Sequence, residues 1–203
     1  MEKIDFKKEY KALFKPSAKK VSIVEVPKFN YLMIDGNGSP AAEEYQHAME
    51  TIYPMAYTLK FMAKTSLQRD FVVNPLEGLW WAEDYIVFSN GNKDAWIWRS
   101  MIMQPDFITE SMFDLAREKV TEKNLASLDK VRLDSMDEGL CAQIMHIGPY
   151  ADEAPTIQKL HQFVEDNGYE LRDKHHEIYL SDPRRAKPEN MKTVIRQPIR
   201  KKA

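Results

Sequence analysis

The sequence predicts an α+β fold in which two βαββ repeats form one antiparallel sheet, with helices on one face and a ligand groove on the pseudo-twofold axis. Two observations lead to this prediction. The order strand, helix, strand, strand occurs twice, and the later strands of the two copies align residue by residue, 78–83 with 177–182 and 100–105 with 193–198. One copy cannot bury its helix face alone, so we expect the copies to pair and the groove to open on the face away from the helices.

Length and composition are those of a globular protein. The chain has 203 residues, of which 43% are hydrophobic and 30% charged, and its formal net charge is −2. This charge gives no electrostatic basis for direct nucleic-acid binding. No apolar stretch is long enough to cross a membrane, and the lone Cys141 excludes a disulfide framework. We therefore expect a soluble cytoplasmic protein whose partner is a small-molecule ligand; the residues identify no protein partner.

The composition changes near residue 20. Residues 1–20 are rich in lysine with scattered aromatic residues, which predicts a short amphipathic N-terminal arm packed on a larger body. We assign residues 21–203 to a single ligand-binding domain. Within it, the first repeat covers about residues 21–105, a linking helix about 108–124, and the second repeat about 130–199.

The first repeat opens with strand-forming residues at 21–26 and 30–35. Ser39, followed by a proline, predicts the start of a helix whose apolar residues keep helical spacing as far as Met62. Pro54 falls inside that helix, so we expect it either to kink the helix or to divide it.

Four further elements follow the first helix. Strands are predicted at residues 78–82 and 95–103, and a second helix from 109 to 123. Residues 131–133 form a weak strand, and a stronger one covers 140–147. The third helix, from 152 to 167, and the strands that contain Glu177 and residues 193–198 complete the second repeat.

The strand at residues 175–180 carries the side chains that suggest a function. Glu177 and Tyr179 point to one face, because side chains alternate along a strand. The ordinary interpretation is a half-exposed strand with Glu177 in water, since an unpaired glutamate is rarely buried. The repeat favours a pocket instead: Gly78 aligns with Glu177, so the cavity would hold one carboxylate, and Trp80 aligns with Tyr179.

Aromatic side chains are the candidates for the walls of this pocket. Trp80 and Trp81 point to opposite faces, so one of them packs in the core. Trp96 and Trp98 share a face, and the pattern leaves open whether that face is core or groove. Tyr150 follows Gly-Pro at a helix start, where it would close one end of the pocket. The predicted ligand-binding residues are Trp80, Trp81, Trp96, Trp98, Tyr150 and Met101.

The sequence carries no pattern for a metal or a cofactor. His175 and His176 are adjacent on a strand and face opposite ways, and no histidine pair has the four-residue spacing of a helical zinc site. The glycines around Asn37 are too few for a phosphate loop and are not followed by Lys-Ser/Thr. We therefore expect the protein to use neither a metal nor a cofactor.

Residues 138–150, 175–183 and 192–196 resemble the GyrI-like small-molecule-binding family, and the similarity extends over about residues 20–199. It implies a duplicated βαββ module, which is also the ligand domain of multidrug-sensing transcription regulators. In that family a pocket glutamate reads the cationic or polar parts of flat aromatic ligands, and it maps onto Glu177. The chain is also similar to a stand-alone subfamily that hydrolyses cyclopropane-bearing DNA-alkylating compounds. About twenty residues precede the similarity, too few for a helix-turn-helix module, so we do not expect a regulator.

Two functions stay open at this point. As a hydrolase, the protein would use Glu177 to orient or deprotonate a water, and Tyr179 would donate a hydrogen bond to the ligand carbonyl that becomes a phenolate. As a binding module, the same residues would sequester or sense a flat aromatic or cationic xenobiotic. In either case we expect burial to raise the pKa of Glu177 above that of an ordinary glutamate, with His175 acting against the shift.

Overall fold

The computed structural model describes residues 3–84 and 91–202, which pack into two compact units. Strand β5 (Leu76–Trp81) contributes its first part to one unit and its end to the other. Unit 1 comprises residues 3–6, 29–74, 80–84 and 91–136, and unit 2 comprises residues 7–28, 75–79 and 137–202.

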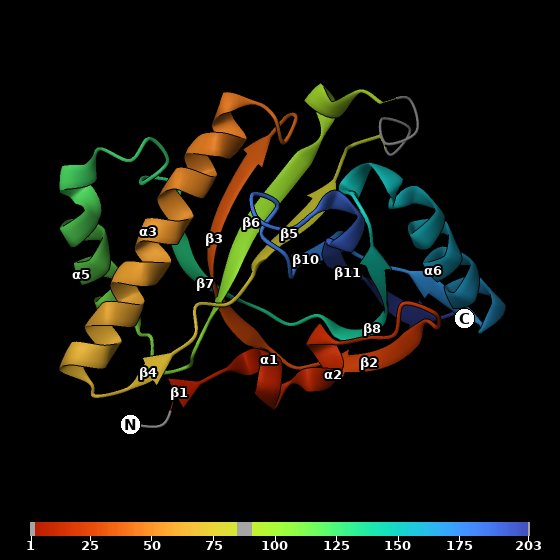
Figure 1. Cartoon of the computed structure of the whole chain (residues 1–203), viewed down its shortest axis with the longest axis horizontal. Helices are drawn as coiled ribbons and strands as arrows, with labels where there is room; N and C mark the ends of the chain where they lie inside the picture. The colour runs from red at the N-terminus through yellow and green to blue at the C-terminus, as the bar shows by residue number, and fades with distance from the viewer. Residues whose placement is uncertain (1–2, 85–90, 203) are drawn as a thin grey trace. The chain divides into compact units, whose positions relative to one another are not determined.

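Unit 1 contains the first repeat, in the order β3, α3, β5, β6. Its elements are β1 (Lys3–Ile4), β3 (Phe29–Asn37), α3 (Glu43–Ser66), β4 (Asp70–Phe71), the end of β5, η1 (Lys93–Ala95), β6 (Ile97–Gln104), α5 (Glu110–Val120), η2 (Thr121–Lys123) and β7 (Arg132–Met136). β3 lies between its antiparallel partners β6 and β7. Helix α3 packs along β3 and β6, and α5 packs against α3 (Figure 1).

Helix α3 differs from its prediction at the start and at its proline. It begins at Glu43 rather than beside Ser39, because Ser39 accepts the amide of Ala41 within a preceding turn. Pro54 does not divide the helix, which runs unbroken to Ser66. The helix buries one apolar stripe, so packing outweighs the one backbone hydrogen bond that the proline removes.

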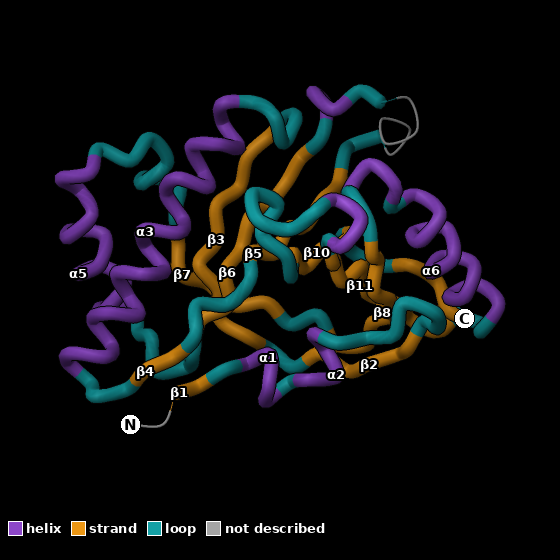
Figure 2. The backbone as a smooth tube through the Cα atoms, in the orientation of Figure 1, coloured by secondary structure: helices purple, strands orange, loops and turns teal. Residues whose placement is uncertain are grey.

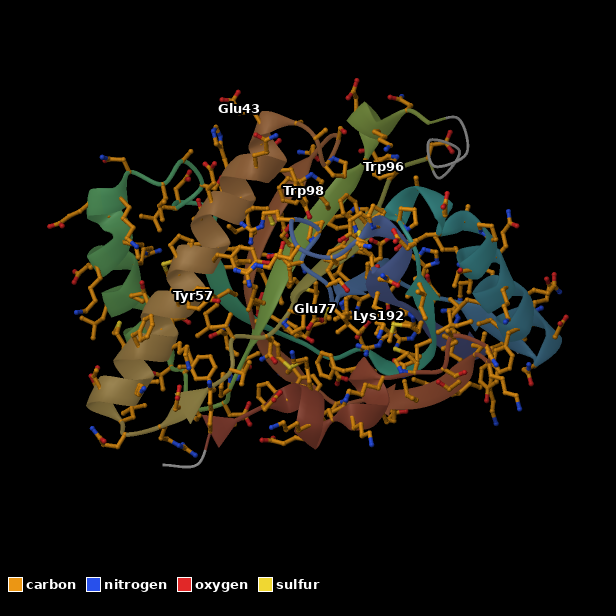
Figure 3. The ribbon with its side chains drawn as sticks, viewed as in Figure 1. Glu43, Tyr57, Glu77, Trp96, Trp98 and Lys192 are labelled. Atoms are coloured by element: carbon orange, nitrogen blue, oxygen red, sulfur yellow. The ribbon has the colours of Figure 1, made fainter. Side chains whose placement is uncertain are left out.

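A tight contact between a glycine and a tryptophan fixes the core of unit 1. Gly36 on β3 lies directly opposite Trp98 on β6. Trp98 is fully buried, and Tyr45 of α3 packs edge-on against it with ring centroids 5.0 Å apart. A Cβ atom on Gly36 would overlap the indole ring, so this position requires glycine. Figure 3 labels Trp98 on its strand.

Unit 2 contains the second repeat, in the order β8, α6, β10, β11. Its elements are α1 (Phe6–Glu9) without its first residue, α2 (Lys11–Phe14), β2 (Ser22–Val26), the start of β5, β8 (Gly139–Ile147), η3 (Tyr150–Asp152), α6 (Ala154–Asp166), β9 (Tyr169–Leu171), β10 (His175–Tyr179), η4 (Pro188–Asn190) and β11 (Lys192–Lys201). Four strands run antiparallel in the order β2, β8, β11, β10, and β9 pairs with the end of β11. Figure 2 shows these strands in orange and α6 in purple.

In each unit, one strand comes from the segment that precedes the other unit's repeat in the sequence. β2 directly precedes β3 in sequence but pairs with β8 in unit 2. In the same way, β7 directly precedes β8 but pairs with β3 in unit 1. Each repeat is therefore completed by the strand that precedes the other repeat, an arrangement that local sequence patterns do not reveal.

The predicted α+β class, with two antiparallel βαββ repeats, is confirmed. Within residues 1–20, Leu13 and Phe14 of α2 are buried in unit 2. Within the described part of the chain, no helix has both the length and the apolar character that crossing a membrane requires.

Candidate functional site

The face of β10 that carries Glu177 is the face covered by helix α6. Glu177 lies opposite Ile195 on β11, and cross-strand partners point to the same side. Ile195 packs in a core cluster with Leu160 and Val164 of α6. The expectation that the site lies on the face away from the helices is therefore wrong for unit 2. Alternation separates two faces of a strand but does not say which one a helix will cover.

Glu177 is held by two neighbours on its own strand. Its side chain is 14% exposed. His175 Nε2 lies 3.0 Å from Oε1, and the Tyr179 hydroxyl donates to Oε2 at 2.7 Å. Tyr150 packs edge-on against Tyr179, with ring centroids 5.5 Å apart. The structure thus brings together three of the predicted site residues, Glu177, Tyr179 and Tyr150, in one unit.

A second carboxyl group, which the sequence analysis missed, lies beside Glu177. Glu153 directly precedes α6 and is only 5% exposed. Burial raises its pKa to about 9, and the negative charge of Glu177 adds to the rise, while the nearby Thr193 hydroxyl opposes it. Near neutral pH Glu153 therefore keeps its proton.

The pKa of Glu177 moves in the opposite direction. Burial acts to raise it, but the hydrogen bond and charge of His175, with hydrogen bonds from Tyr179 and Glu153, lower it below the ordinary glutamate value. The expected rise in the pKa of Glu177 is therefore wrong, and the rise belongs to Glu153. Together the two carboxyl groups carry one proton and one negative charge, with the charge on Glu177.

Sequence reasoning had no signal for Glu153. Acidic residues are common at helix starts, where the helix dipole favours them, so a glutamate at that position does not indicate a functional site. Its meeting with Glu177 depends on how the Gly-Pro-Tyr turn places the start of α6 above β10, which is a tertiary relationship. The same holds for Thr193, which lies opposite Tyr179 across the β10–β11 pair.

A second charged cluster lies on the other face of β10. The ring of His176 sits between two carboxylates, with Nδ1 2.9 Å from Glu138 Oε1 and Nε2 2.9 Å from Glu77 Oε2. Arg196 Nη1 approaches Glu138 Oε2 at 3.2 Å. None of these four residues is more than 4% exposed.

The charges of this cluster stabilise one another. Burial acts to lower the pKa of His176, but Glu138 and Glu77 raise it to about 9. Burial acts to raise the pKa of Glu138, but His176 and Arg196 lower it to about 2. His176 and Glu138 therefore keep opposite charges across the physiological range, so each offsets part of the cost of burying the other.

The same cluster holds the N-terminal arm. Arg196 Nη2 donates to the carbonyl of Leu13 at 2.9 Å, and Gln143 Nε2 donates to the carbonyl of Ala12 at 2.8 Å. Arg196 Nε in turn donates to Gln143 at 3.2 Å. We interpret this cluster as structural, because the contacts described above tie together separate segments of unit 2.

The predicted tryptophans lie in unit 1. Trp80 is 6% exposed, stacks on Tyr45 at 5.9 Å between ring centroids, and meets the edge of Trp96 at 5.7 Å. Trp81 and Trp96 are half-buried. Tyr45, from α3, joins this aromatic group without having been predicted. It was missed because its helical spacing read as ordinary core packing.

Two predicted ligand-binding residues fill the core of unit 1. Trp98 and Met101 are fully buried, and alternation along β6 puts them on opposite faces of the strand. Trp96 borders an open hollow, lined by Asn37, Glu83, Asp84, Asp94, Ala95, Trp96 and Ile97. In the described residues, no three or more His, Cys, Asp or Glu side chains are arranged to hold a metal ion.

Comparison with known proteins agrees with this fold. Residues 19–200 match the GyrI-like small molecule binding domain. A conserved protein from Listeria innocua is 45% identical and a hydrolase from Listeria innocua is 44% identical, with TM-scores of 0.91 and 0.89, and each match covers 98% of this chain and 100% of the other. The EcmrR C-terminal domain, 15% identical with a TM-score of 0.57 over 90% of this chain and 98% of that one, shares the fold alone. No curated protein matches the sequence. The chain therefore belongs to the GyrI-like small-molecule-binding family.

Proposed function

We propose that the Glu177 cluster binds flat aromatic or cationic xenobiotics in the cytoplasm and hydrolyses those that carry a strained, electrophilic cyclopropane. The observation that carries the proposal is the carboxyl pair, in which a buried, ionised Glu177 lies beside a Glu153 that keeps its proton. A site of this kind has one base and one negative charge. The 44% identity to a hydrolase from Listeria innocua supports the proposal of hydrolysis.

In the proposed reaction a water oxygen attacks the least hindered cyclopropane carbon. The new C–O bond forms as the cyclopropane C–C bond breaks, and the bonding pair moves through the conjugated ring to its carbonyl oxygen, which becomes a phenolate. The water proton passes to the Glu177 carboxylate. His175 and Tyr179 orient that carboxylate through their contacts at 3.0 and 2.7 Å.

The role of Tyr179 as a donor to the ligand carbonyl is part of the proposal, with one added condition. Its hydroxyl donates to Glu177 in this structure, so it would have to turn away from Glu177 to reach a ligand. Stacking on Tyr150 supplies a second ligand contact, because Tyr150 packs against Tyr179 and is 41% exposed. Ligand contacts by Trp80, Trp81 and Trp96 also remain proposals.

Binding without chemistry is the second candidate function. The single negative charge of the carboxyl pair suits a cationic aromatic ligand whether or not a water is activated. A protein of this kind would protect the cell by sequestration. The two candidates share their binding residues and differ only in whether the bound compound is changed.

The test is to incubate the purified protein with a cyclopropane-bearing alkylating compound and to measure the ring-opened hydrate by mass spectrometry. We expect hydrate well above the buffer control, and a loss of about 100-fold or more in Glu177→Gln, because the base is gone. Glu165→Gln is the matched control and should keep full activity, because Glu165 lies on α6 in the same unit with a side chain that is 69% exposed. A compound that binds but stays unchanged would reject hydrolysis and leave sequestration.

A further inference from the structure

In the described part of the chain, two buried polar atoms near Glu177 make no hydrogen bond of ordinary geometry. Thr193 is fully buried and Glu153 is 5% exposed. Among the described residues, neither Thr193 Oγ1 nor Glu153 Oε1 makes a hydrogen bond of ordinary geometry, although the two side chains are close enough for the hydroxyl to act on the carboxyl. Leaving such an atom without a partner is energetically costly. Folded proteins keep few such atoms, and those that persist point to a bound molecule or a catalytic role.

The strand register places these atoms on the face of Glu177. Thr193 lies two residues before Ile195 on β11, and Ile195 is the cross-strand partner of Glu177. The hydroxyl of Thr193 therefore points to the same side as the Glu177 carboxylate. Glu153 interacts directly with Glu177 from the start of α6. Three side chains from three elements thus meet at one place.

The neighbouring polar groups on this face have other partners. His146, opposite Thr193 on β8, contacts the Thr156 hydroxyl at 3.0 Å and the carbonyl of Pro149 at 3.2 Å. The Tyr179 hydroxyl donates to Glu177. His146 and the Tyr179 hydroxyl therefore do not need Thr193 Oγ1 or Glu153 Oε1 as hydrogen-bond partners.

We infer that Thr193 and Glu153 hold the water that Glu177 deprotonates, an inference that rests on the proposed hydrolysis. A buried water needs two to four polar partners. Thr193 Oγ1 can donate a hydrogen bond to the water oxygen, and Glu153 Oε1 can accept a hydrogen bond from the O–H that the product keeps. The other water proton is transferred to the Glu177 carboxylate as the C–O bond forms. The Glu153 side chain also forms a hydrogen bond with Glu177. Thr193 then touches the reacting oxygen and is a catalytic residue.

The test compares Thr193→Val with Thr193→Ser in the hydrate assay. Valine keeps the branched shape of threonine and removes the hydroxyl, whereas serine keeps the hydroxyl. We expect kcat to fall about 10-fold or more in the valine variant, with KM within about twofold of the wild type, because one hydrogen bond to the nucleophile is lost. Serine should restore kcat to within about threefold of the wild type. Unfolding midpoints show whether each variant folds, and Thr193→Ala replaces valine if valine does not fold.

A competing nucleophile separates water positioning from general damage. With azide added, wild-type protein should give mostly hydrate, because the water is held in place and azide is not. Thr193→Val should shift the ratio of products toward the azide adduct, and Thr193→Ser should not. A merely structural role would lower both products together and leave their ratio unchanged.

The outcomes distinguish the two proposals. If wild-type protein makes the hydrate but Thr193→Val matches it in rate and product ratio, the water site is wrong and hydrolysis by Glu177 stands. If the wild type makes no hydrate, the proposed hydrolysis fails and the water site fails with it. A rate loss in both the valine and serine variants, with an unchanged product ratio, would assign Thr193 to packing and overturn the inference.

Discussion

His176 and Glu177 are neighbours on β10, and their side chains belong to two separate buried clusters on opposite faces of that strand. His176 lies 2.9 Å from the carboxyl groups of both Glu138 and Glu77 in a buried ion-pair cluster. Glu177 lies 3.0 Å from His175, in a site that keeps one net negative charge on its carboxyl pair. One face of the strand thus carries the structural ion-pair cluster of His176. The other face carries the Glu177 carboxylate, which can act as a base.

Replacing His176 should destabilise the protein in a pH-dependent way. His176→Gln leaves Glu77 and Glu138 without their shared cation, and removing one partner of a buried ion pair costs about 3–5 kcal/mol. Since the pKa of His176 is raised from 6.5 to about 9, the stability that its charge contributes is complete below about pH 6.5 and is lost as the pH rises through about 9.

Urea unfolding at pH 6 and pH 9 measures this loss. The difference in free energy of unfolding between wild type and His176→Gln should shrink at the higher pH. His47→Gln is the matched control, since His47 lies on α3 with a side chain 37% exposed. A difference that stays constant between the two pH values would show that His176 is not charged in the folded protein.

Replacing Glu153 by glutamine should stabilise the protein increasingly as the pH rises. The folded protein keeps a proton on Glu153 up to about pH 9, whereas the unfolded chain releases it above about pH 4.5. Wild-type stability therefore falls between these values, by at most about 1.4 kcal/mol per pH unit from this group. Glutamine is always neutral and avoids the loss. Denaturation curves at pH 5, 7 and 8.5 should diverge from the wild type, while those of Glu165→Gln should run parallel to it.

Replacing Glu177 by glutamine should weaken the binding of cationic ligands more than the binding of neutral ones. The variant removes a charge-assisted contact in a buried site, which we expect to cost about 1.5–3 kcal/mol for a flat aromatic cation such as ethidium. A neutral polycyclic compound of similar area should lose little binding free energy. Isothermal calorimetry with both ligands measures the two losses. Equal losses would mean that Glu177 does not recognise charge.

Adding one methyl group at Gly36 should destabilise unit 1. The new Cβ atom overlaps the indole of Trp98, and overpacking of a core costs about 1–3 kcal/mol. Thermal unfolding of Gly36→Ala, Trp98→Phe and the double variant forms a cycle. We expect the double variant to be more stable than the sum of the single losses predicts, since phenylalanine leaves room for the methyl group. Strict additivity would place the cost elsewhere.

The sequence by itself determined the elements and one face of the site. Hydrophobic periods of 2 and 3.6 residues are local, so the strands and helices of both repeats could be predicted from them. The common face of Glu177, Tyr179 and His175 follows from alternation along a single strand, and their contacts agree with it. The start of α3 was misplaced because Ser39 makes its hydrogen bonds within a turn instead of capping the helix.

Only the tertiary structure decided which side chains from distant segments meet. Glu153 reaches Glu177 from the start of α6, and Thr193 reaches Glu153 from β11. Glu77 and Arg196 reach His176 and its partner Glu138 from two further segments. The strand exchange of β2 and β7 is equally invisible in a local pattern. A pKa depends on burial and on charges within a few ångströms, so the proton on the carboxyl pair could be assigned to Glu153 only once those neighbours were placed in space.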